Sequence, residues 1–321
     1  MKRTIRLKLI NEEKTMTYDA ATGLSFLLSQ LTYIETKMYE KKYKAINYAD
    51  VIPVSQEAGE WAESITYFYM DGAAIAEFVG SKSLNVPISE IGTKKITVPV
   101  ELGATGYEYS DEELRQAVQL KRPLPQLKAN TARRAYEELA QRTAMVGNPT
   151  HNLPGFLNNP NVTVTTVVNG AGGTPTWVTK TPEEILFDVN DLMGDIFVDS
   201  LQIERASTLL LPTANWNYIF STPSSEYRDT SIAAWLVANS PYLSSESDIK
   251  PLAELTGAGS GGVNRMMAYD KDIDKVVFHI PMPLRFTEPQ RKGRGFQVPG
   301  EFKIGGVEFR YPGSARYADG I

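Results

Sequence analysis

A long stretch with the composition of β-strands, residues 64–109, leads almost directly into a long polar helical pattern, residues 123–146. Its first arm contains Ile65 to Tyr69 and then Ala74 to Val79, and its second contains Lys95 to Val100 and then Tyr107 to Tyr109. These are runs of β-branched and aromatic residues with partial alternation. Roughly a dozen residues separate the arms, which is too many for a tight hairpin turn. Such a projecting ribbon buries little of itself, so the pattern predicts a protein whose neighbouring subunits cover it.

Composition narrows the possible classes of protein. The 321 residues suffice for one large domain or two ordinary ones. No apolar run approaches the roughly 20 residues of a membrane helix, and no apolar segment behind Met1 indicates a signal peptide. The chain has no cysteine, which excludes disulfides and thiolate metal sites. The net charge of −5 predicts that any contact with nucleic acid is local and weak.

Several helices are expected before and after the β-rich stretch. Apolar residues at spacings of three and four predict an amphipathic helix over residues 20–40, which we expect to pack on the body of the protein more readily than on a neighbour or a scaffold. Residues 45–60 are interpreted as an extended connector. Ser110 and Glu113 form a capping-box pattern that starts a short helix ending near Leu120.

The helical pattern ending at Val146 is long, on the order of 30 Å. We expect its apolar side to be a narrow line of residues, flanked by Ala132 and Tyr136, namely Leu127, Thr131, Ala135, Leu139 and Val146. Its basic residues oppose Glu137 and Glu138, which favours a solvated or salt-bridged face over a phosphate-binding one. Residues 181–265 then alternate helix and strand, and residues 266–321 are rich in strands.

Motifs that carry chemistry are weak. The glycines of residues 257–262 match a dinucleotide-binding pattern by letter, but a strand pattern follows where a helix is required. Asp270, Asp272 and Asp274 lack the rest of a calcium loop and favour a charged turn. The acidic stripe Asp188, Asp191, Asp195 and Asp199 is interpreted as a solvated face. His151 and His279 have no sequence context that indicates a relay. The sequence therefore predicts no catalytic, cofactor-binding or metal site and no enzymatic activity.

The order of these elements resembles the major capsid proteins of tailed bacteriophages, whose fold is shared with encapsulin nanocompartments and herpesvirus capsid floors. Several local segments also look like that family, in the same order along the chain: residues 48–54, 153–162, 208–212, 257–265, 279–283 and 310–321. Each segment alone is a weak signal. Their shared order covers nearly the whole chain and carries the resemblance.

The resemblance implies an α+β fold with the family's regions. These are an N-terminal arm and amphipathic helix (1–63), an extended loop (64–109), a peripheral domain with its spine helix at 123–146 (110–180), an axial domain (181–265), and a β-rich return completing the peripheral domain (266–321). Candidate contacts between subunits lie in the extended loop and spine helix: Tyr67, Tyr69, Lys94, Lys95, Arg133, Arg134, Glu137 and Glu138. We expect no lysine–asparagine crosslink, and no cleavable scaffolding segment at the front.

The implied function is a capsid shell. Copies would assemble through pentamers and hexamers into an icosahedral or prolate head around double-stranded DNA, in the host bacterial cytoplasm. The expected partners are the chain itself, a separate scaffolding protein, a portal, decoration proteins and weakly bound DNA, with no membrane. The alternative with the same fold is an encapsulin-like shell around a protein cargo. A soluble α/β enzyme using the glycine loop and a β-rich adhesin or tail component are more distant alternatives.

Overall fold

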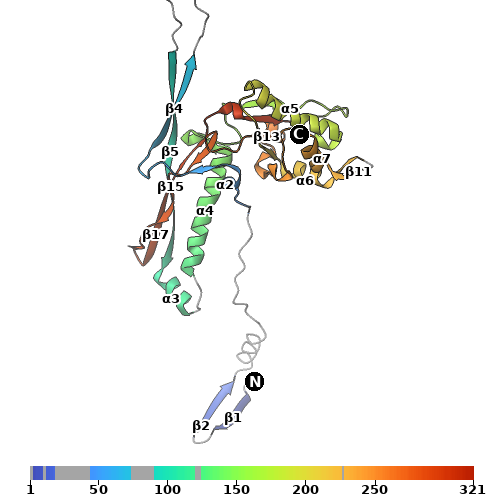
Figure 1. The fold of residues 1–321 in the computed structure, drawn as a ribbon. Coiled ribbons are helices and arrows are strands. Elements are labelled where there is room, and N and C mark those ends of the chain that lie inside the picture. Colours follow the sequence, from blue (N-terminus) through green and yellow to red (C-terminus); the bar gives the residue numbers. More distant parts are fainter. Residues whose placement is uncertain (1–2, 10–11, 19–43, 74–89, 120–123, 226–227) are drawn as a thin grey trace, which may run out of the picture. The chain divides into compact units, whose positions relative to one another are not determined.

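The computed structural model describes residues 3–9, 12–18, 44–73, 90–119, 124–225 and 228–321, which fall into two units, Met1–Ala45 and Ile46–Ile321 (Figure 1). In the first unit, β1 (Arg3–Leu9) pairs antiparallel with β2 (Glu12–Tyr18). The expected N-terminal arm thus contains a hairpin. The helix predicted over residues 20–40 lies outside the described residues.

The long strands predicted in the second unit are confirmed. Strand β4 (Ser64–Ala73) pairs antiparallel with β5 (Glu90–Ser110), from Ser64 opposite Pro99 to Ala73 opposite Glu90. Residues 74–79, predicted to continue the first arm, lie outside the described residues. Beyond the hairpin, β5 pairs with β17 (Gly295–Gly305), so that the sheet has the order β15-β17-β5-β4, with β15 at Met282–Phe286 and β16 (Gln290–Lys292) added beside β17.

Two helices follow the hairpin. The capping box predicted for α3 (Asp111–Gln119) is confirmed, because Ser110 Oγ accepts from the Glu113 amide at 3.1 Å and the Glu113 carboxylate accepts from the Ser110 amide at 3.0 Å. Helix α4 (Leu124–Val146) lies alongside β5 (Figure 1). Gly147, with φ +78°, ends α4 and leads into the short strand β6 (Gly147–Asn148), which pairs with β7 (Leu153–Pro154).

The apolar line predicted along α4 is wrong, since Leu139 and Val146 are exposed. The flanking residues Ala132 and Tyr136 are buried instead, together with Ala140, Ala144 and Met145. The ring of Tyr136 meets that of Phe302 on β17 edge to face, with centroids 4.9 Å apart. The alanines allow the helix backbone to approach the sheet closely, so small side chains, and not the larger leucine and valine, mark the packed face.

The segment predicted as an extended connector begins with a helical turn, α2 (Tyr48–Val51), and continues as β3 (Val54–Ser55). Strand β3 pairs parallel with β14 (Val276–His279), which pairs antiparallel with β18 (Val307–Phe309). These strands, α4 and the large sheet enclose the first hydrophobic core, whose large members include Ile52, Phe156, Tyr269, Phe278, Phe302 and Tyr317.

The second core lies around a separate five-stranded sheet with the order β12-β9-β13-β19-β8. The strands are β8 (Thr163–Thr166), β9 (Thr208–Leu211), β12 (Ile249–Pro251), β13 (Arg265–Tyr269) and β19 (Ala315–Asp319). Its helices, α5 (Pro182–Asp199), α6 (Thr213–Ser221) and α7 (Ile232–Asn239), confirm the helix and strand alternation predicted here. Between α6 and α7, β10 (Pro223–Ser225) pairs with β11 (Arg228–Ser231).

This sheet crosses the boundary expected at residue 265. Strand β13 pairs with β9 on one side and with β19 on the other, so strands from residues 266–321 belong to the same sheet as the middle block. Strands β13 and β19 thus join residues 266–321 to the middle block, and the division into peripheral and axial domains stays a prediction. A strand's sequence gives its alternation but not its partner, so this shared sheet could not be predicted.

Candidate functional site

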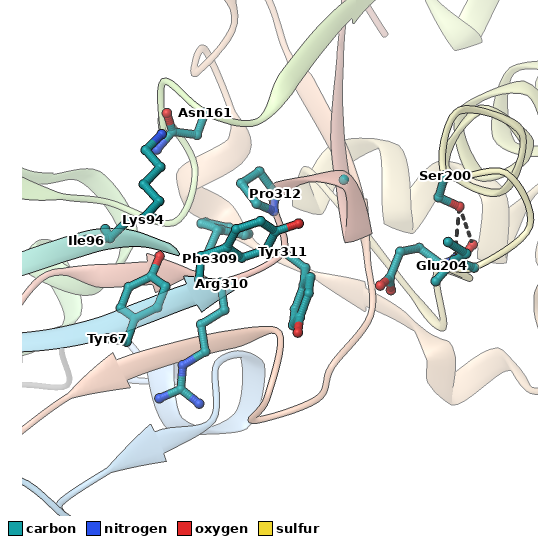
Figure 2. A pocket seen from close by; sticks show the side chains of 13 residues that line it. Tyr67, Lys94, Ile96, Asn161, Ser200, Glu204, Phe309, Arg310, Tyr311 and Pro312 are labelled. Atoms are coloured by element: carbon teal, nitrogen blue, oxygen red, sulfur yellow. Dashed lines mark hydrogen bonds between the residues drawn. The ribbon is translucent and has the colours of Figure 1, made fainter. Parts of the chain in front are cut away.

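The β4–β5 hairpin presents two different faces. Residues directly opposite each other on antiparallel strands share a face, as do residues two apart on one strand. Tyr67 lies opposite Ile96, and Tyr69 lies opposite Lys94. These four residues line a groove of about 640 Å³ on the body of the same chain (Figure 2). The groove is completed by Asn161, Ser200, Ile203, Glu204 and residues 309–313. The predicted contact residues Tyr67, Tyr69 and Lys94 are thus brought together at this groove.

The opposite face of the hairpin carries three large apolar side chains that the subunit leaves exposed. It carries Phe68, Met70 and Ile91, whose exposed fractions are 68%, 70% and 71%. Lys95, a predicted contact residue, lies on this face opposite Phe68 and is also exposed. Sequence reasoning selected the tyrosines and missed these three residues. Strand alternation was the available signal, because it places Phe68 and Met70 out of phase with the tyrosines.

The groove is built from aromatic and charged side chains. The ring of Tyr69 meets that of Tyr311 edge to face, with centroids 6.4 Å apart. Burial raises the pKa of Tyr67, and the negative charge of Glu308 raises it further, while Arg310 acts in the opposite direction. Both tyrosines therefore contribute to packing the hairpin base on its own subunit.

A strained turn forms the far wall of the groove. Leu201 and Gln202 adopt left-handed backbone conformations, with φ of 54° and 70°, although neither is glycine. Ser200 fixes the turn, since its hydroxyl accepts from the Glu204 amide at 2.9 Å and donates to the Glu204 carbonyl (Figure 2). The turn leaves the side chains of Leu201 and Ile203 exposed.

The predicted contact residues on α4 differ in the contacts that they make within their own subunit. Arg134 Nε lies 3.0 Å from Glu138 Oε1 in an (i, i+4) ion pair, as expected for a salt-bridged face. Glu137 accepts a hydrogen bond from the Tyr48 hydroxyl at 3.0 Å, which ties α4 to α2. Burial raises the pKa of that hydroxyl, as does the neighbouring Glu137 charge. Arg133 is exposed beside this contact. Contacts of these residues with another subunit remain a prediction.

The histidines differ from expectation. His279 Nε2 lies 2.5 Å from Glu308 Oε2, and both side chains are buried. The pair joins β14 to β18, which no local sequence pattern brings together. His151 lies 3.4 Å from Glu101 at the surface. Both histidines thus have carboxylate partners that their sequence context does not reveal, because these partners are distant in sequence.

The acidic stripe on α5 is also less solvated than predicted. Asp188 is buried, 2.6 Å from Lys180 Nζ and 3.0 Å from Trp177 Nε1. Burial raises the pKa of Asp188, although Lys180 and Trp177 oppose the shift. Further along α5, Arg316 of β19 forms ion pairs with Asp195 and Asp199. The stripe thus binds α5 to its own sheet.

The glycine run and the aspartates of residues 270–274 form a loop and a turn, as predicted. The glycine run enters a 3-10 turn (Ser260–Gly262) and then β13, so it lacks the following helix of a dinucleotide site. Asp270 accepts from Lys275 within a turn between β13 and β14. Among the described residues, no group of three or more potential ligand side chains could hold a metal ion. No described helix is long and apolar enough to cross a membrane.

The family model and the similar solved structures all concern capsid proteins. The family model described as "Major capsid protein" matches residues 74–321. The capsid of Myoviridae phage XM1 is similar with a TM-score of 0.77 and 17% identity, over 91% of this chain and 98% of that one. A structure of Mycobacterium phage Ogopogo has a TM-score of 0.59 and 13% identity, over 91% of this chain and 98% of that one.

A third solved structure, the capsid of a native GTA particle, has a TM-score of 0.61 and 12% identity, over 90% of this chain and 94% of that one. No curated protein sequence matches the chain significantly. The TM-scores show that the chain shares the fold of these capsid proteins, and identities this low show nothing beyond the fold. The match to the family model shows which family the sequence belongs to.

Proposed function

The chain belongs to the family of major capsid proteins and forms a capsid shell, and from this premise we propose that its copies assemble through pentamers and hexamers into an icosahedral or prolate head enclosing double-stranded DNA. The similar capsid of a native GTA particle was computed with five-fold symmetry, which supports pentamers in a related shell. The encapsulin-like alternative is not favoured, since the matching family and the similar structures are phage and GTA capsids.

The observation that carries the proposal is the uncovered apolar face of the hairpin. An isolated two-stranded ribbon is marginally stable in water, and one face of this ribbon is apolar and open. Covering Phe68, Met70 and Ile91 by a neighbouring subunit removes this apolar surface from water. Repeated at every copy, modest contacts of this kind add up to a stable closed shell.

The regions of the subunit have proposed places in the shell. The second core, built on residues 181–265 together with β8, β13 and β19, would form the axial domain at the centre of each ring. Helix α4 and the large sheet would form the peripheral domain, and the hairpin would reach over a neighbour as the extended loop. Tyr67, Tyr69, Lys94, Lys95 and the charged residues of α4 stay candidate contacts within this arrangement.

The proposed partners follow from the same role. A separate scaffolding protein, a portal and decoration proteins would act during or after assembly in the host bacterial cytoplasm, and the product is the virion capsid. The net charge of −5 supports weak, non-specific contact with packaged DNA, because a strongly basic lining would hold phosphates tightly. We propose a purely structural role, without enzymatic activity.

The contents of isolated particles test this proposal. Particles from host cells that make the complete virus are treated with nuclease, purified by sedimentation, and assayed for protected nucleic acid and for other proteins. Protected double-stranded DNA within shells of this chain is the expected result. Shells that contain one abundant enzyme and no DNA would instead establish the nanocompartment alternative.

A further inference from the structure

We propose that the loop around Trp61 on one copy binds the basic turn at residues 291–294 of a second copy. The two surfaces carry complementary groups that contacts within the chain leave unused. The inference rests on the proposed assembly into rings, and it identifies a pair of surfaces that would hold neighbouring copies together.

Trp61 is the most exposed large apolar side chain that the structure describes, at 84%. The loop that carries it is nonetheless ordered by a turn, in which the Ala62 amide donates to the Gly59 carbonyl at 2.9 Å. The indole lies against Gly59, since a Cβ at that position would stand 2.4 Å from the indole Nε1. A large aromatic group held in one place before binding loses little conformational entropy when a partner covers it.

Acidic residues lie close to Trp61 in the sequence, on both sides of it. Glu57 and Glu63 are exposed, and neither forms an ion pair with a residue that the structure describes. Glu60 lies between them in sequence and is held by Arg285 at 3.1 Å. An aromatic face flanked by free carboxylates is suited to a lysine or arginine, through cation–π attraction and opposite charge. The surface around Trp61 therefore fits a cationic partner.

The basic turn between β16 and β17 offers such cations. Gly293 adopts φ +59°, which makes the turn tight. Arg291 is engaged on its own copy, 3.4 Å from Asp111 and with its guanidinium over the Phe296 ring. Lys292 and Arg294 are exposed, and within the described part of the chain neither has an ion-pair partner. Two adjacent cations are thus left for an external acidic surface.

The geometry requires a second copy. Lys303 near one end of β17 donates to the Ala62 carbonyl at 3.1 Å, which fixes the position of the Trp61 loop. Gly295 at the other end of β17 adjoins the basic turn, near α3 (Figure 1). At about 3.3 Å per residue along a strand, the two surfaces are roughly 25–30 Å apart on one copy. Contact between them is therefore head to tail, the type of interface that closes into rings.

Charge exchange between the two surfaces tests the inference. One variant carries Glu57→Lys and Glu63→Lys, and a second carries Lys292→Glu and Arg294→Glu. We expect each to raise the protein concentration needed for assembly about tenfold or more, because like charges then meet at the interface. The chain with all four changes should regain assembly, since the opposite charges are restored between copies. An equal mixture of the two variants should restore rings of six, in which the variants can alternate, but not rings of five, in which two copies of one variant must meet.

Controls separate this inference from the wider proposal. Arg142→Glu and Glu246→Lys reverse exposed charges elsewhere and should not rescue either variant. Thermal unfolding of the unassembled subunits should be unchanged in every variant. If the native chain assembles and neither reversal weakens assembly, or if the four changes together give no recovery, the Trp61 contact is overturned while the shell remains. If the native chain forms no assembly at all, the ring proposal itself fails.

Discussion

Arg265 and Asp319 face each other across β13 and β19, joined by hydrogen bonds from Nε to Oδ1 at 2.6 Å and from Nη2 to Oδ2 at 2.9 Å. Both side chains are buried. Arg265 also donates to the Leu157 carbonyl at 2.7 Å and lies over the Tyr317 ring, while Asp319 accepts from the Ser260 amide. One ion pair thus joins the last strand, the glycine loop and the segment after α4.

Removing one partner of this pair should be costly. Asp319→Ala leaves the Arg265 guanidinium buried without a counter-charge, so we expect the free energy of unfolding to fall by about 3–5 kcal/mol. Denaturant unfolding of the unassembled subunit measures the change. Glu138→Gln, which removes an exposed ion pair on α4, is the matched control and should cost about 0.5 kcal/mol. Equal losses in the two variants would contradict the assigned importance of the buried pair.

The same pair predicts a pH dependence. Burial raises the pKa of Asp319, but hydrogen bonds from Arg265 and the Ser260 amide outweigh it, so the pKa lies below its ordinary value. A lowered pKa in the folded state contributes stability above the ordinary carboxyl pKa of about 4, and this contribution is lost as pH falls through the folded-state pKa. The difference in unfolding free energy between the native chain and Asp319→Asn should therefore narrow in acid. A difference that stays constant down to about pH 2 would contradict this account.

A glycine behind α4 offers a steric test. A Cβ on Gly155 would lie 2.3 Å from the Val146 carbonyl carbon and 2.5 Å from the Gly147 amide nitrogen. Gly155→Ala should therefore displace the end of α4 and destabilise the subunit by about 1–3 kcal/mol. At Gly313 a Cβ would meet nothing within 4 Å, so Gly313→Ala should be neutral or slightly stabilising. Thermal unfolding of both variants is the measurement, and equal melting temperatures would count against the proposed clash.

The outward face of the hairpin predicts an effect on assembly alone. Phe68→Ser with Met70→Ser removes apolar surface that the subunit does not bury, so the unassembled chain should unfold as the native one does. The assembled fraction in sedimentation should fall strongly. Thr93 lies opposite Met70 on the same face. Thr93→Ala is therefore the control for a substitution on this face that removes no large apolar side chain, and it should assemble normally. Normal assembly of the serine variant would show that this face is not an interface.

Local patterns predicted the elements of this fold well. The capping residue Ser110, the long strands of the hairpin and the length of α4 all follow from interactions between residues close in sequence. What failed depends on partners far away in sequence. The Ala140 face of α4 is buried because a sheet lies against it, which hydrophobicity along the helix does not reveal.

At the candidate site, too, the sequence predicts features that depend on local pattern and misses those that depend on distant partners. Tyr67 and Tyr69 were selected from the sequence for their residue type, but the groove beside residues 309–313 shows that they pack on their own chain. The apolar face with Phe68 and the exposed Trp61 became apparent only from exposure in the folded subunit. His279 and Glu308 likewise meet through strand pairing. The type of a residue indicates which contacts its side chain can make, and the tertiary structure determines whether that side chain is exposed to a partner.

Electron microscopy of the native chain, expressed with and without the proposed scaffolding protein and combined with sedimentation velocity, tests the central claim most directly. Closed shells, or rings of five and six copies, are the predicted result. A monodisperse monomer or dimer that persists with the scaffolding protein and under crowding would contradict the claim that this chain builds a capsid.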